Sequence, residues 1–430
     1  MRILIDFAYL FAAVAVSPMI LYRMVRQRRY RIGWGNRLGR IRRKNPDKKC
    51  IWIHAVSVGE VNATRTIIDE LRNKFPEFEI VVSTTTDTGY ARAKAIFGDS
   101  MTVIFFPLDF SWIMRQAFER IHPAVCLLME LEVWPNFVHI AKGLNIPVVV
   151  VNGRISDRSF SRYKLIRPIA KKIFRQISLI LAQTDEYAGR FREISSLDSE
   201  VIVTGSLKYD TAVTDEKVEG ADAVKTQLGI GDEKLWVAGG TGVDEEKILL
   251  DVYRSLKQDD KFSDLRLVIV PRKPERFDEV GQLIEQSGMS LIRYSRVKAG
   301  ASLSTDNKQA VILGDTMGEL RKFYSLATII FVGRSLVPMG GSDMMEAAAL
   351  GKCTMFGPHA FNFKQAVEAL LAGEGAIMVK DGDELQETME RCLLEPGFAQ
   401  KIANNGREVI RKNQGATKKT IEQISKFLRA

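Results

Sequence analysis

The chain has 430 residues, of which 46% are hydrophobic, so it is long enough for two domains with full cores. Its four cysteines are scattered without C-x-x-C spacing, which argues against a disulfide framework or a zinc site and fits a reducing cytosol. The net charge is +10, but residues 23–49 alone hold nine Arg and three Lys against one Asp, a net of +11. The rest of the chain is close to neutral, so we expect no nucleic-acid partner.

The first predicted element is an apolar segment over residues 3–22. As a helix of about 20 residues it reaches about 30 Å, the thickness of a bilayer's hydrocarbon core. The basic residues behind it predict a body on the cytoplasmic side, facing an anionic phospholipid leaflet. We therefore expect a membrane anchor over residues 1–22, of the signal-anchor type, and a basic juxtamembrane segment over 23–49.

Other interpretations of this segment stay open. A cleaved signal peptide is disfavoured because Asp6 interrupts the apolar run and the basic block opposes export. A buried core helix is the second alternative, because Asp6 and Pro18 weaken a span. A membrane helix can either cross the bilayer or lie at its surface, and Pro18 allows a kink in a short insertion.

Beyond residue 49, short β-branched runs alternate with amphipathic stretches, which is typical of a doubly wound α/β fold. In the first half we predict strands at 50–54, 80–84, 103–106, 124–128, 147–151 and 179–182, with helices at 60–74, 110–121 and 162–175. In the second half we predict strands at 235–238, 266–270, 310–313, 327–332 and 353–356.

This pattern predicts two Rossmann-like domains, 50–206 and 221–397, joined by a linker at 207–220. A C-terminal helical segment, 398–430, is expected to pack back toward the first domain. Ligands of such folds bind at the carboxyl ends of the strands, so we expect the two domains to face a cleft there.

Three acids in the first half follow predicted strands. Glu60 comes after the first strand, at the start of a helix whose N-terminus keeps a carboxylate ionised, as a general base requires. Glu130 and Glu132 come after the fourth strand, and crowding of carboxylates raises a pKa toward neutrality. Two structural alternatives remain: Glu60 is a favourable first-turn acid, or one of the pair caps the following helix.

The second half has the pattern of a phosphate and nucleotide site. Gly239-Gly240-Thr241-Gly242 and Gly340-Gly341-Ser342-Asp343 each lie between a strand and a helix, where backbone amides bind anions. Arg272, at the end of another strand, can bind a phosphate or carboxylate bidentately. Neither glycine loop has GxGxxG or GxxxxGK[ST] spacing, which disfavours dinucleotide enzymes and P-loop ATPases. The four isolated histidines do not indicate a metal site.

Six short motifs then occur in series: Ser57-Val58-Gly59-Glu60, Glu130-x-Glu132-x-Trp134-Pro135-Asn136, Gly205-Ser206-Leu207-Lys208-Tyr209-Asp210, Pro271-Arg272-x-x-Glu275-Arg276, Met317-Gly318-Glu319-Leu320 and Phe356-Gly357-Pro358-His359. With this set the chain closely resembles the 3-deoxy-D-manno-octulosonic acid (Kdo) transferases of lipopolysaccharide assembly. These are inverting glycosyltransferases of the GT-B architecture that need no metal. One departure concerns the family's Gly-Gly-His-Asn-Pro-Leu-Glu, which reads Gly340-Gly341-Ser342-Asp343-Met344-Met345-Glu346 here and places an acid where an amide is expected.

The resemblance implies a transfer of Kdo from CMP-Kdo to the primary hydroxyl of a lipid A precursor (lipid IVA) at the cytoplasmic face of the inner membrane. It implies Glu60 as the general base, with Glu130 and Lys208 supporting the transition state, and neither a cofactor nor a metal. The residues matching the family's contacts to CMP are Pro271, Arg272, Met317, Gly318, Glu319, Asp343, Met344, Met345 and Glu346. In the basic segment, we expect Arg37 and Arg40 to contact phosphates of the lipid acceptor.

Two other classes of function compete with this one. GT-B folds also support UDP-sugar epimerases, which use similar carboxylates and phosphate loops but need no membrane anchor. A catalytically silent membrane scaffold has no need of Glu60, Lys208 and Arg272 together. Both alternatives are therefore disfavoured by particular residues of this chain.

Overall fold

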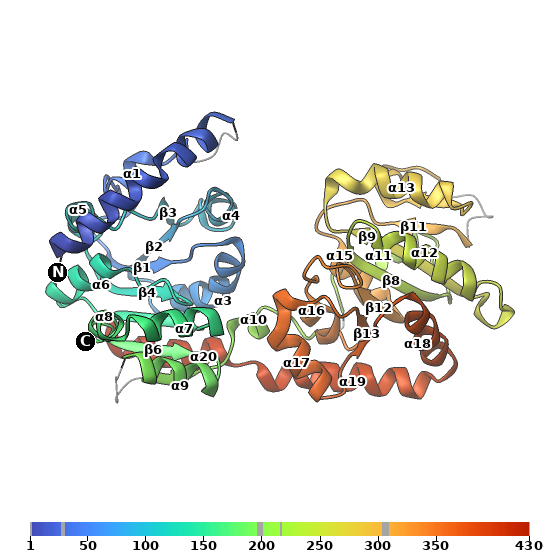
Figure 1. The fold of residues 1–430 in the computed structure, drawn as a ribbon. Helices are drawn as coiled ribbons and strands as arrows, with labels where there is room; N and C mark the ends of the chain where they lie inside the picture. The colour runs from blue at the N-terminus through green and yellow to red at the C-terminus, as the bar shows by residue number, and fades with distance from the viewer. Residues whose placement is uncertain (1, 27–30, 196–200, 216, 303–308, 430) are drawn as a thin grey trace. The chain divides into compact units, whose positions relative to one another are not determined.

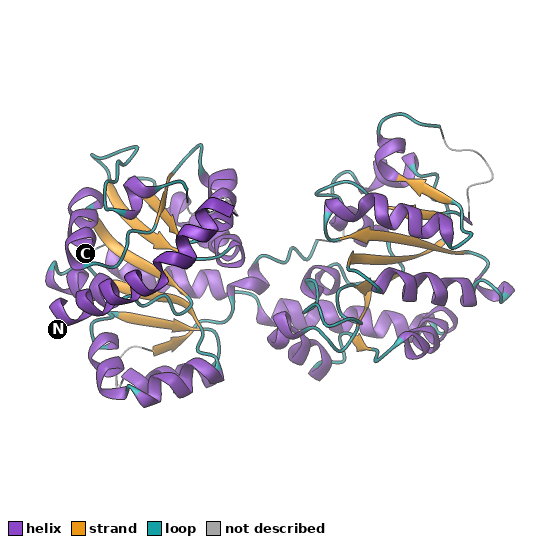
Figure 2. Cartoon of the chain, turned by 45° about the horizontal axis from the view of Figure 1, so that its top comes forward, coloured by secondary structure: helices purple, strands orange, loops and turns teal. Residues whose placement is uncertain are grey.

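The computed structural model describes residues 2–26, 31–195, 201–215, 217–302 and 309–429 (Figure 1). It divides into two compact units: unit 1 comprises Met1–Thr211 and Gln414–Ala430, and unit 2 comprises Ala212–Asn413. In each unit a parallel sheet lies between layers of helices (Figure 2). The prediction of two doubly wound α/β domains is therefore confirmed.

The sheet of unit 1 has seven strands within the described residues, in the order β3-β2-β1-β4-β5-β6-β7. The strands are β1 (Lys49–His54), β2 (Phe78–Thr84), β3 (Thr102–Phe105), β4 (Pro123–Met129), β5 (Val148–Gly153), β6 (Leu179–Ala182) and β7 (Val201–Val203). The helices are α1 (Arg2–Arg26), α2 (Trp34–Arg37), α3 (Val58–Lys74), α4 (Asp87–Phe97), α5 (Ser111–Ile121), α6 (Pro135–Gly143), α7 (Asp157–Leu165), α8 (Arg167–Phe174), α9 (Asp185–Ser195), α10 (Leu207–Asp210) and α20 (Ala416–Leu428).

Alternation along β1 explains the two layers of helices. Cys50 and Trp52 point to one face, where they pack with residues of α5, α6, α8 and α9. Ile51 and Ile53 point to the other face, where α3, α4 and α20 cover them. Because successive side chains of a strand alternate, a strand that is apolar throughout has to be buried on both faces.

The sheet of unit 2 also has seven described strands, in the order β10-β11-β9-β8-β12-β13-β14. The strands are β8 (Lys234–Thr241), β9 (Leu265–Pro271), β10 (Leu291–Arg293), β11 (Val311–Leu313), β12 (Ile329–Val332), β13 (Cys353–Phe356) and β14 (Ile377–Met378). The α-helices are α11 (Ala221–Gln227), α12 (Glu245–Leu256), α13 (Phe277–Gln286), α14 (Tyr294–Lys298), α15 (Leu320–Leu326), α16 (Met344–Ala349), α17 (Lys364–Ala372), α18 (Gly382–Leu394) and α19 (Pro396–Asn413). Short 3-10 helices cover Asp260–Phe262, Pro274–Arg276 and Phe361–Phe363.

Three local predictions differ from the structure. The helix predicted over 162–175 is two helices, α7 and α8, because Pro168 disfavours helical continuation and Ile166 leaves the helical conformation. The edge strands β7, β10 and β14 were not predicted, since two or three residues carry too little periodicity. The loop predicted at Gly239-Gly240-Thr241-Gly242 lies mostly inside β8, which continues to Thr241.

The C-terminal segment 398–430 is divided between the units. Its first part continues α19, which belongs to unit 2, and α20 alone packs on unit 1 (Figure 1). Asp210 fixes the start of α20, because its carboxylate accepts hydrogen bonds from the backbone N–H groups of Gly415, at 2.7 Å, and Thr417. The break between the units falls at Thr211, inside the expected linker.

At the N-terminus, α1 includes Ile5–Arg26, a segment long and apolar enough to cross a membrane, with a mean hydropathy of 1.7. None of its most apolar window is buried, which removes the interpretation as a core helix. The basic segment behind it is part of the fold of unit 1 rather than a separate juxtamembrane segment. Arg43 and Glu79 form a buried ion pair at 2.9 Å, with both side chains 3% exposed, and Glu79 also accepts from the backbone of Lys44 and Asn45.

Removing the carboxylate of this pair by Glu79→Ala should strongly destabilise unit 1. Arg43 is then left as a buried, uncompensated charge, which costs about 3–5 kcal/mol in comparable proteins. Urea unfolding followed by circular dichroism measures this difference. The matched control is Asp69→Ala, which breaks the exposed Arg65–Asp69 pair of α3 and should cost less than about 1 kcal/mol. Equal stabilities of the two variants would show that the Arg43–Glu79 pair does not secure the basic segment.

Candidate functional site

Glu60 is fixed at the start of α3, directly after β1. Ser57 is the N-cap residue, and its hydroxyl accepts a hydrogen bond from the backbone N–H of Glu60. In return, the Glu60 carboxylate accepts from the Ser57 hydroxyl and from the backbone N–H of Val56, both at 2.9 Å. This reciprocal cap shows that Glu60 is a structural first-turn acid, and it also holds the half-buried carboxylate in one position at the carboxyl edge of the sheet.

Glu130 and Glu132 follow β4, which pairs with β1, so the structure brings them to the same edge as Glu60. Glu130 has a φ of +55°, a left-handed conformation that is uncommon outside glycine and costs on the order of 1–3 kcal/mol. Glu132 accepts a hydrogen bond from the indole nitrogen of Trp134 at 3.2 Å. Backbone strain of this kind clusters at functional sites.

The residue that caps α6 is Asp109 rather than Glu130 or Glu132. Its carboxylate accepts from the backbone N–H groups of Asn136, at 2.9 Å, and Phe137, at 2.8 Å. Asp109 lies 26 residues before α6 in the chain, so no local pattern indicated this role. Because α6 has its cap elsewhere, the two glutamates are available to face the site.

The three carboxylates crowd one another electrostatically. Burial and the charges of Glu60 and Glu130 together raise the pKa of Glu132 to about 7, and the Trp134 hydrogen bond opposes this rise. Burial also raises the pKa of Glu60, opposed by the N–H of Val56 and reinforced by the charge of Glu130. A carboxyl group in this cluster therefore exchanges its proton near neutral pH, as acid–base chemistry requires.

Tyr163 on α7 is a site residue that sequence reasoning missed. Burial and the nearby charge of Glu132 both raise the pKa of its phenol, so the hydroxyl stays protonated beside the carboxylates. Its position in an amphipathic helix gave no sign of this placement. In the fold α7 follows β5, and the ring of Tyr163 packs edge-on against Phe174 of α8.

Lys208 lies on α10, a short helix that packs against α3. Its backbone is fixed from two sides. The N–H of Leu207 donates to the side-chain oxygen of Asn152 at the end of β5, and Asp210 holds the start of α20. The structure therefore places a half-buried ammonium group on the helix next to that of Glu60.

The two arginines expected at the acceptor differ in their surroundings. Arg37 is 7% exposed: its guanidinium donates to the carbonyl of Thr85, lies 4.2 Å from the ring centre of Phe105 and is 3.8 Å from Asp87. These contacts commit Arg37 to the fold, because they bury and pair its charge. Arg40 is exposed. Contact with acceptor phosphates is therefore retained as a proposal for Arg40 and corrected for Arg37.

In unit 2 the two glycine loops lie against each other. The hydroxyl of Ser342 donates to the carbonyl of Gly240 at 2.8 Å. Gly240 has a φ of +69°, and a Cβ there would lie 2.6 Å from that hydroxyl oxygen, so only glycine fits. Ser342 thus joins the segment that follows β12 to the last residues of the neighbouring strand β8.

Glu245, at the start of α12, binds the backbone of the same two loops. Its buried carboxylate accepts from the backbone N–H groups of Gly242, Arg334, Ser335 and Leu336. Burial raises its pKa, and these four donors oppose the shift. Sequence reasoning missed this role, although a first-turn acid after a glycine loop is a recognisable signal.

The residues expected at CMP partly gather at this edge. Arg272 is exposed after β9, and its backbone N–H donates to Thr241 at 3.1 Å. Burial and the charge of Asp343 raise the pKa of Glu346, while Arg321 and Arg272 lower it, so these groups lie within electrostatic reach of one another.

The remaining CMP candidates have distinct environments. Asp343 caps α16 by accepting from the N–H of Met345 at 2.9 Å, a role that an Asn also serves. The side chains of Met344 and Met345 are buried in the core, and Pro271 is buried at the end of β9. Met317 is exposed and Gly318 has a φ of +83°. Glu319 is held by Lys298, at 2.6 Å, and Lys322, at 2.7 Å.

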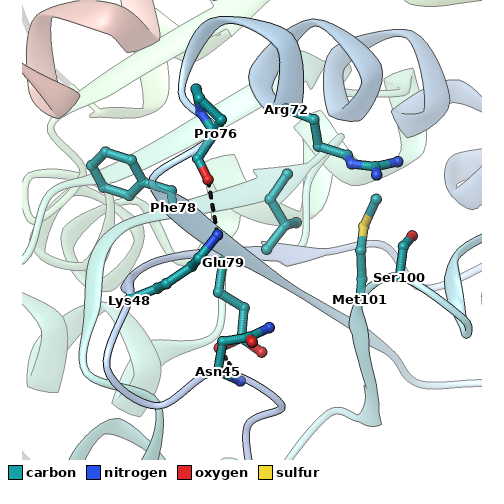
Figure 3. A pocket seen from close by; sticks show the side chains of 9 residues that line it. Asn45, Lys48, Arg72, Pro76, Phe78, Glu79, Ser100 and Met101 are labelled. Atoms are coloured by element: carbon teal, nitrogen blue, oxygen red, sulfur yellow. Dashed lines mark hydrogen bonds between the residues drawn. The ribbon is translucent and has the colours of Figure 1, made fainter.

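A pocket of about 230 Å³ opens at the other edge of the sheet of unit 1, near the amino ends of β2 and β3 (Figure 3). It is lined by Asn45, Lys48, Arg72, Pro76, Phe78, Glu79, Ile80, Ser100 and Met101. The ammonium of Lys48 donates to the carbonyl of Pro76 at 3.0 Å, and Glu79 is taken by Arg43. The pocket contains none of the acids after β1 and β4, so it is separate from the candidate site.

Comparison with known proteins was made against families, relatives and solved structures. Residues 32–211 match the model of the family described as 3-deoxy-D-manno-octulosonic-acid transferase (kdotransferase). The chain is 35% identical to the 3-deoxy-D-manno-octulosonic acid transferase of Haemophilus influenzae, over 89% of this chain and 88% of that protein.

Two solved structures share the fold. A glycosyltransferase from Rickettsia africae superposes with a TM-score of 0.58 at 15% identity, covering 89% of this chain and 99% of its own. The UDP-GlcNAc 2-epimerase of Neisseria meningitidis gives a TM-score of 0.54 at 15% identity, covering 88% and 100%. Both support the GT-B architecture and, at this identity, nothing about the reaction.

Replacing Glu132 by Gln should change how stability depends on pH. A carboxyl whose folded pKa is about 7, against 4.5 unfolded, stabilises the fold fully below pH 4.5 and loses that contribution as pH rises to 7. The unfolding free energy of the parent should therefore fall, relative to Glu132→Gln, by about 1–3 kcal/mol between pH 4.5 and 8, at about 1.4 kcal/mol per pKa unit.

Urea unfolding at pH 4.5, 6, 7 and 8 measures this difference, with the exposed Glu422→Gln on α20 as the control. Parallel pH profiles for parent and Glu132→Gln would contradict the crowding of the three carboxylates.

Proposed function

The chain belongs to the 3-deoxy-D-manno-octulosonic acid transferase family and is a glycosyltransferase, and we propose that it transfers Kdo from CMP-Kdo to a hydroxyl group of a lipid A precursor. The observation that carries this proposal is the capped carboxylate of Glu60, whose pKa is raised by burial, beside Glu130 and Glu132. A base held at the carboxyl edge of a sheet is what deprotonation of a sugar hydroxyl requires. The acceptor in this proposal is lipid IVA, through its primary hydroxyl.

The proposed chemistry is a single inverting displacement. The acceptor oxygen forms a bond to the anomeric carbon of Kdo as its proton passes to the Glu60 carboxylate. The bond between that carbon and the phosphate oxygen breaks, and CMP leaves with the electron pair. Because attack and departure occur on opposite faces, the base and the nucleotide are served by different groups, with Glu60 in unit 1 and Arg272 in unit 2.

Charge development at the donor is met by protein cations in this proposal, and we expect no metal or cofactor. Lys208 and Arg272 offset the negative charge that grows on the departing phosphate. Glu130, held in its left-handed conformation, supports the transition state from the side of the acceptor. The remaining nucleotide contacts are proposed for the backbone of the loop locked by Ser342 and Glu245, together with Met317, Gly318 and Glu346.

The proposed location is the cytoplasmic face of the inner membrane, because the acceptor is a lipid. The apolar helix α1 and the exposed cations of the basic segment support contact with an anionic phospholipid leaflet. The proposed contact of Arg40 with acceptor phosphates is supported by its exposure. A UDP-sugar epimerase is disfavoured by family membership, although the fold is shared.

Incubation of the full-length protein with CMP-Kdo and a tetraacylated lipid A precursor in detergent tests the function directly. Mass spectrometry of the lipid should show increments of one Kdo unit, with release of an equal amount of CMP. The same incubation with UDP-N-acetylglucosamine, followed by NMR, tests for epimerisation. A lipid of unchanged mass in the presence of intact donor, or turnover of the UDP-sugar, would exclude the proposed transfer.

Glu60→Gln should abolish most of the transfer while leaving the protein folded. Gln can maintain the reciprocal cap with Ser57, but it cannot accept the acceptor's proton, and general bases contribute about 10²–10⁴ in rate. The measurement is kcat from the same assay, with thermal unfolding as the check on folding. Glu70→Gln is the matched control, because Glu70 is exposed on the same helix. A kcat within a factor of about three of the parent would assign the base to another residue.

A further inference from the structure

One face of α1 carries an apolar stripe whose side chains are largely exposed. The stripe residues are Phe7, Phe11, Val14, Leu21, Tyr22 and Val25, whose side chains are 59–79% exposed. At about 3.6 residues per turn, these positions fall on one side of a helix. An exposed apolar stripe of this length, without a charge, is unfavourably hydrated and is typical of a surface that binds an apolar partner.

The other face of α1 is bound to unit 1 by a polar cluster. The Asp6 carboxylate accepts hydrogen bonds from the backbone N–H of Ser111 at 2.9 Å, the Ser111 hydroxyl at 2.6 Å and the side-chain amide of Asn136 at 3.0 Å. The Tyr9 hydroxyl donates to Asp109 at 3.0 Å. Asp109 and Asn136 are themselves buried at the start of α6. The N-terminal turns of α1 are therefore bound to the body that carries Glu60.

The C-terminal turns of α1 are separated from the folded part of unit 1 by only a few residues of sequence. Arg31 donates to the carbonyls of Met24 and Val25, and the buried Arg37 follows six residues later. From Asp6 to Met24 a helix extends about 27 Å, nearly the hydrocarbon thickness. A helix crossing the bilayer would thus carry Asp6 and Tyr9 to the far side, away from Ser111, Asp109 and Asn136.

From these contacts we propose that α1 does not cross the membrane but lies in the plane of an anionic leaflet, with its apolar stripe in the acyl region and its Asp6 face on unit 1. This inference rests on the proposed membrane location and changes its geometry. In-plane placement keeps all three hydrogen bonds to Asp6, whereas a crossing helix breaks them. Arg23 and Arg26 at one end, with exposed Arg40, supply the charge that complements the leaflet.

Insertion depth along the stripe distinguishes the two geometries. The four native cysteines are buried, so single cysteines at Phe7, Val14 and Val25 can carry nitroxide labels with little background. The labelled full-length protein is reconstituted in vesicles of phosphatidylethanolamine and phosphatidylglycerol, and depth is measured from relaxation by oxygen and by a water-soluble nickel chelate. A label at exposed Glu422 reports the aqueous reference.

We expect all three labels at one shallow depth, about 5–10 Å below the headgroups. A spanning helix instead places Val14 near the bilayer centre, with Phe7 and Val25 nearer opposite surfaces. That depth profile, or aqueous values at all three labels, would overturn the proposal. Because depth is read without turnover, a failed transfer assay leaves this result intact.

Topology in cells provides a second, independent measurement. An Arg2→Cys protein in spheroplasts should react with a membrane-impermeant maleimide only after lysis, because in-plane binding keeps both ends of α1 in the cytoplasm. Labelling of intact spheroplasts would place the N-terminus outside and establish a crossing helix. A cysteine at Glu422 is the matched cytoplasmic control.

Discussion

The site of unit 1 depends on the cost of burying carboxylates at one edge of one sheet. β1 and β4 are neighbours, so the acids that follow them lie at the same edge, where burial and neighbouring negative charge disfavour the charged forms of Glu60 and Glu132. The fold offsets this for Glu60 with the Val56 N–H and the Ser57 hydroxyl, but gives Glu132 only the Trp134 indole. The charged form of Glu60 is therefore stabilised by more hydrogen bonds than the charged form of Glu132. This difference suits Glu60 to accept a proton and Glu132 to hold one.

Unit 2 also buries a carboxylate, that of Glu245, but surrounds it with hydrogen-bond donors. Glu245 is as buried as any acid in the described chain, yet four backbone N–H groups converge on it and the loops after β8 and β12 take their shape from that convergence. Its charge is used for structure and is shielded from ligands. Arg272 is exposed nearby, and its guanidinium is able to bind an anion bidentately.

Much of this arrangement was predictable from the sequence, because buried parallel strands are apolar throughout and their carboxyl ends collect ligands. The strand pattern placed Glu60 and Glu130 at carboxyl ends, whereas the role expected of Lys208 came from the resemblance, because the strand before it, β7, was not predicted. Asp109, Tyr163 and Glu245 were missed because their roles depend on partners distant in the chain. The short strands β7, β10 and β14 carry no usable periodicity, and the division of the C-terminal segment at Asn413 depends on Asp210 holding α20.

The basic segment contains two kinds of cation that a count of net charge does not distinguish: buried arginines that stabilise the fold, and exposed cations that can face a leaflet. Arg37 and Arg43 are buried and paired, so their charges stabilise unit 1 and contribute little to an external field. The exposed cations include Arg26 at the end of α1, and Arg40 and Arg42, which lie between these structural arginines in the chain. The field offered to a leaflet is therefore smaller than the net of +11 indicates and is carried by residues whose backbone is already fixed. Arg40 is only three residues from Arg43, whose ion pair with Glu79 belongs to the folded unit. An attraction between Arg40 and the leaflet therefore acts on the orientation of unit 1 as a whole.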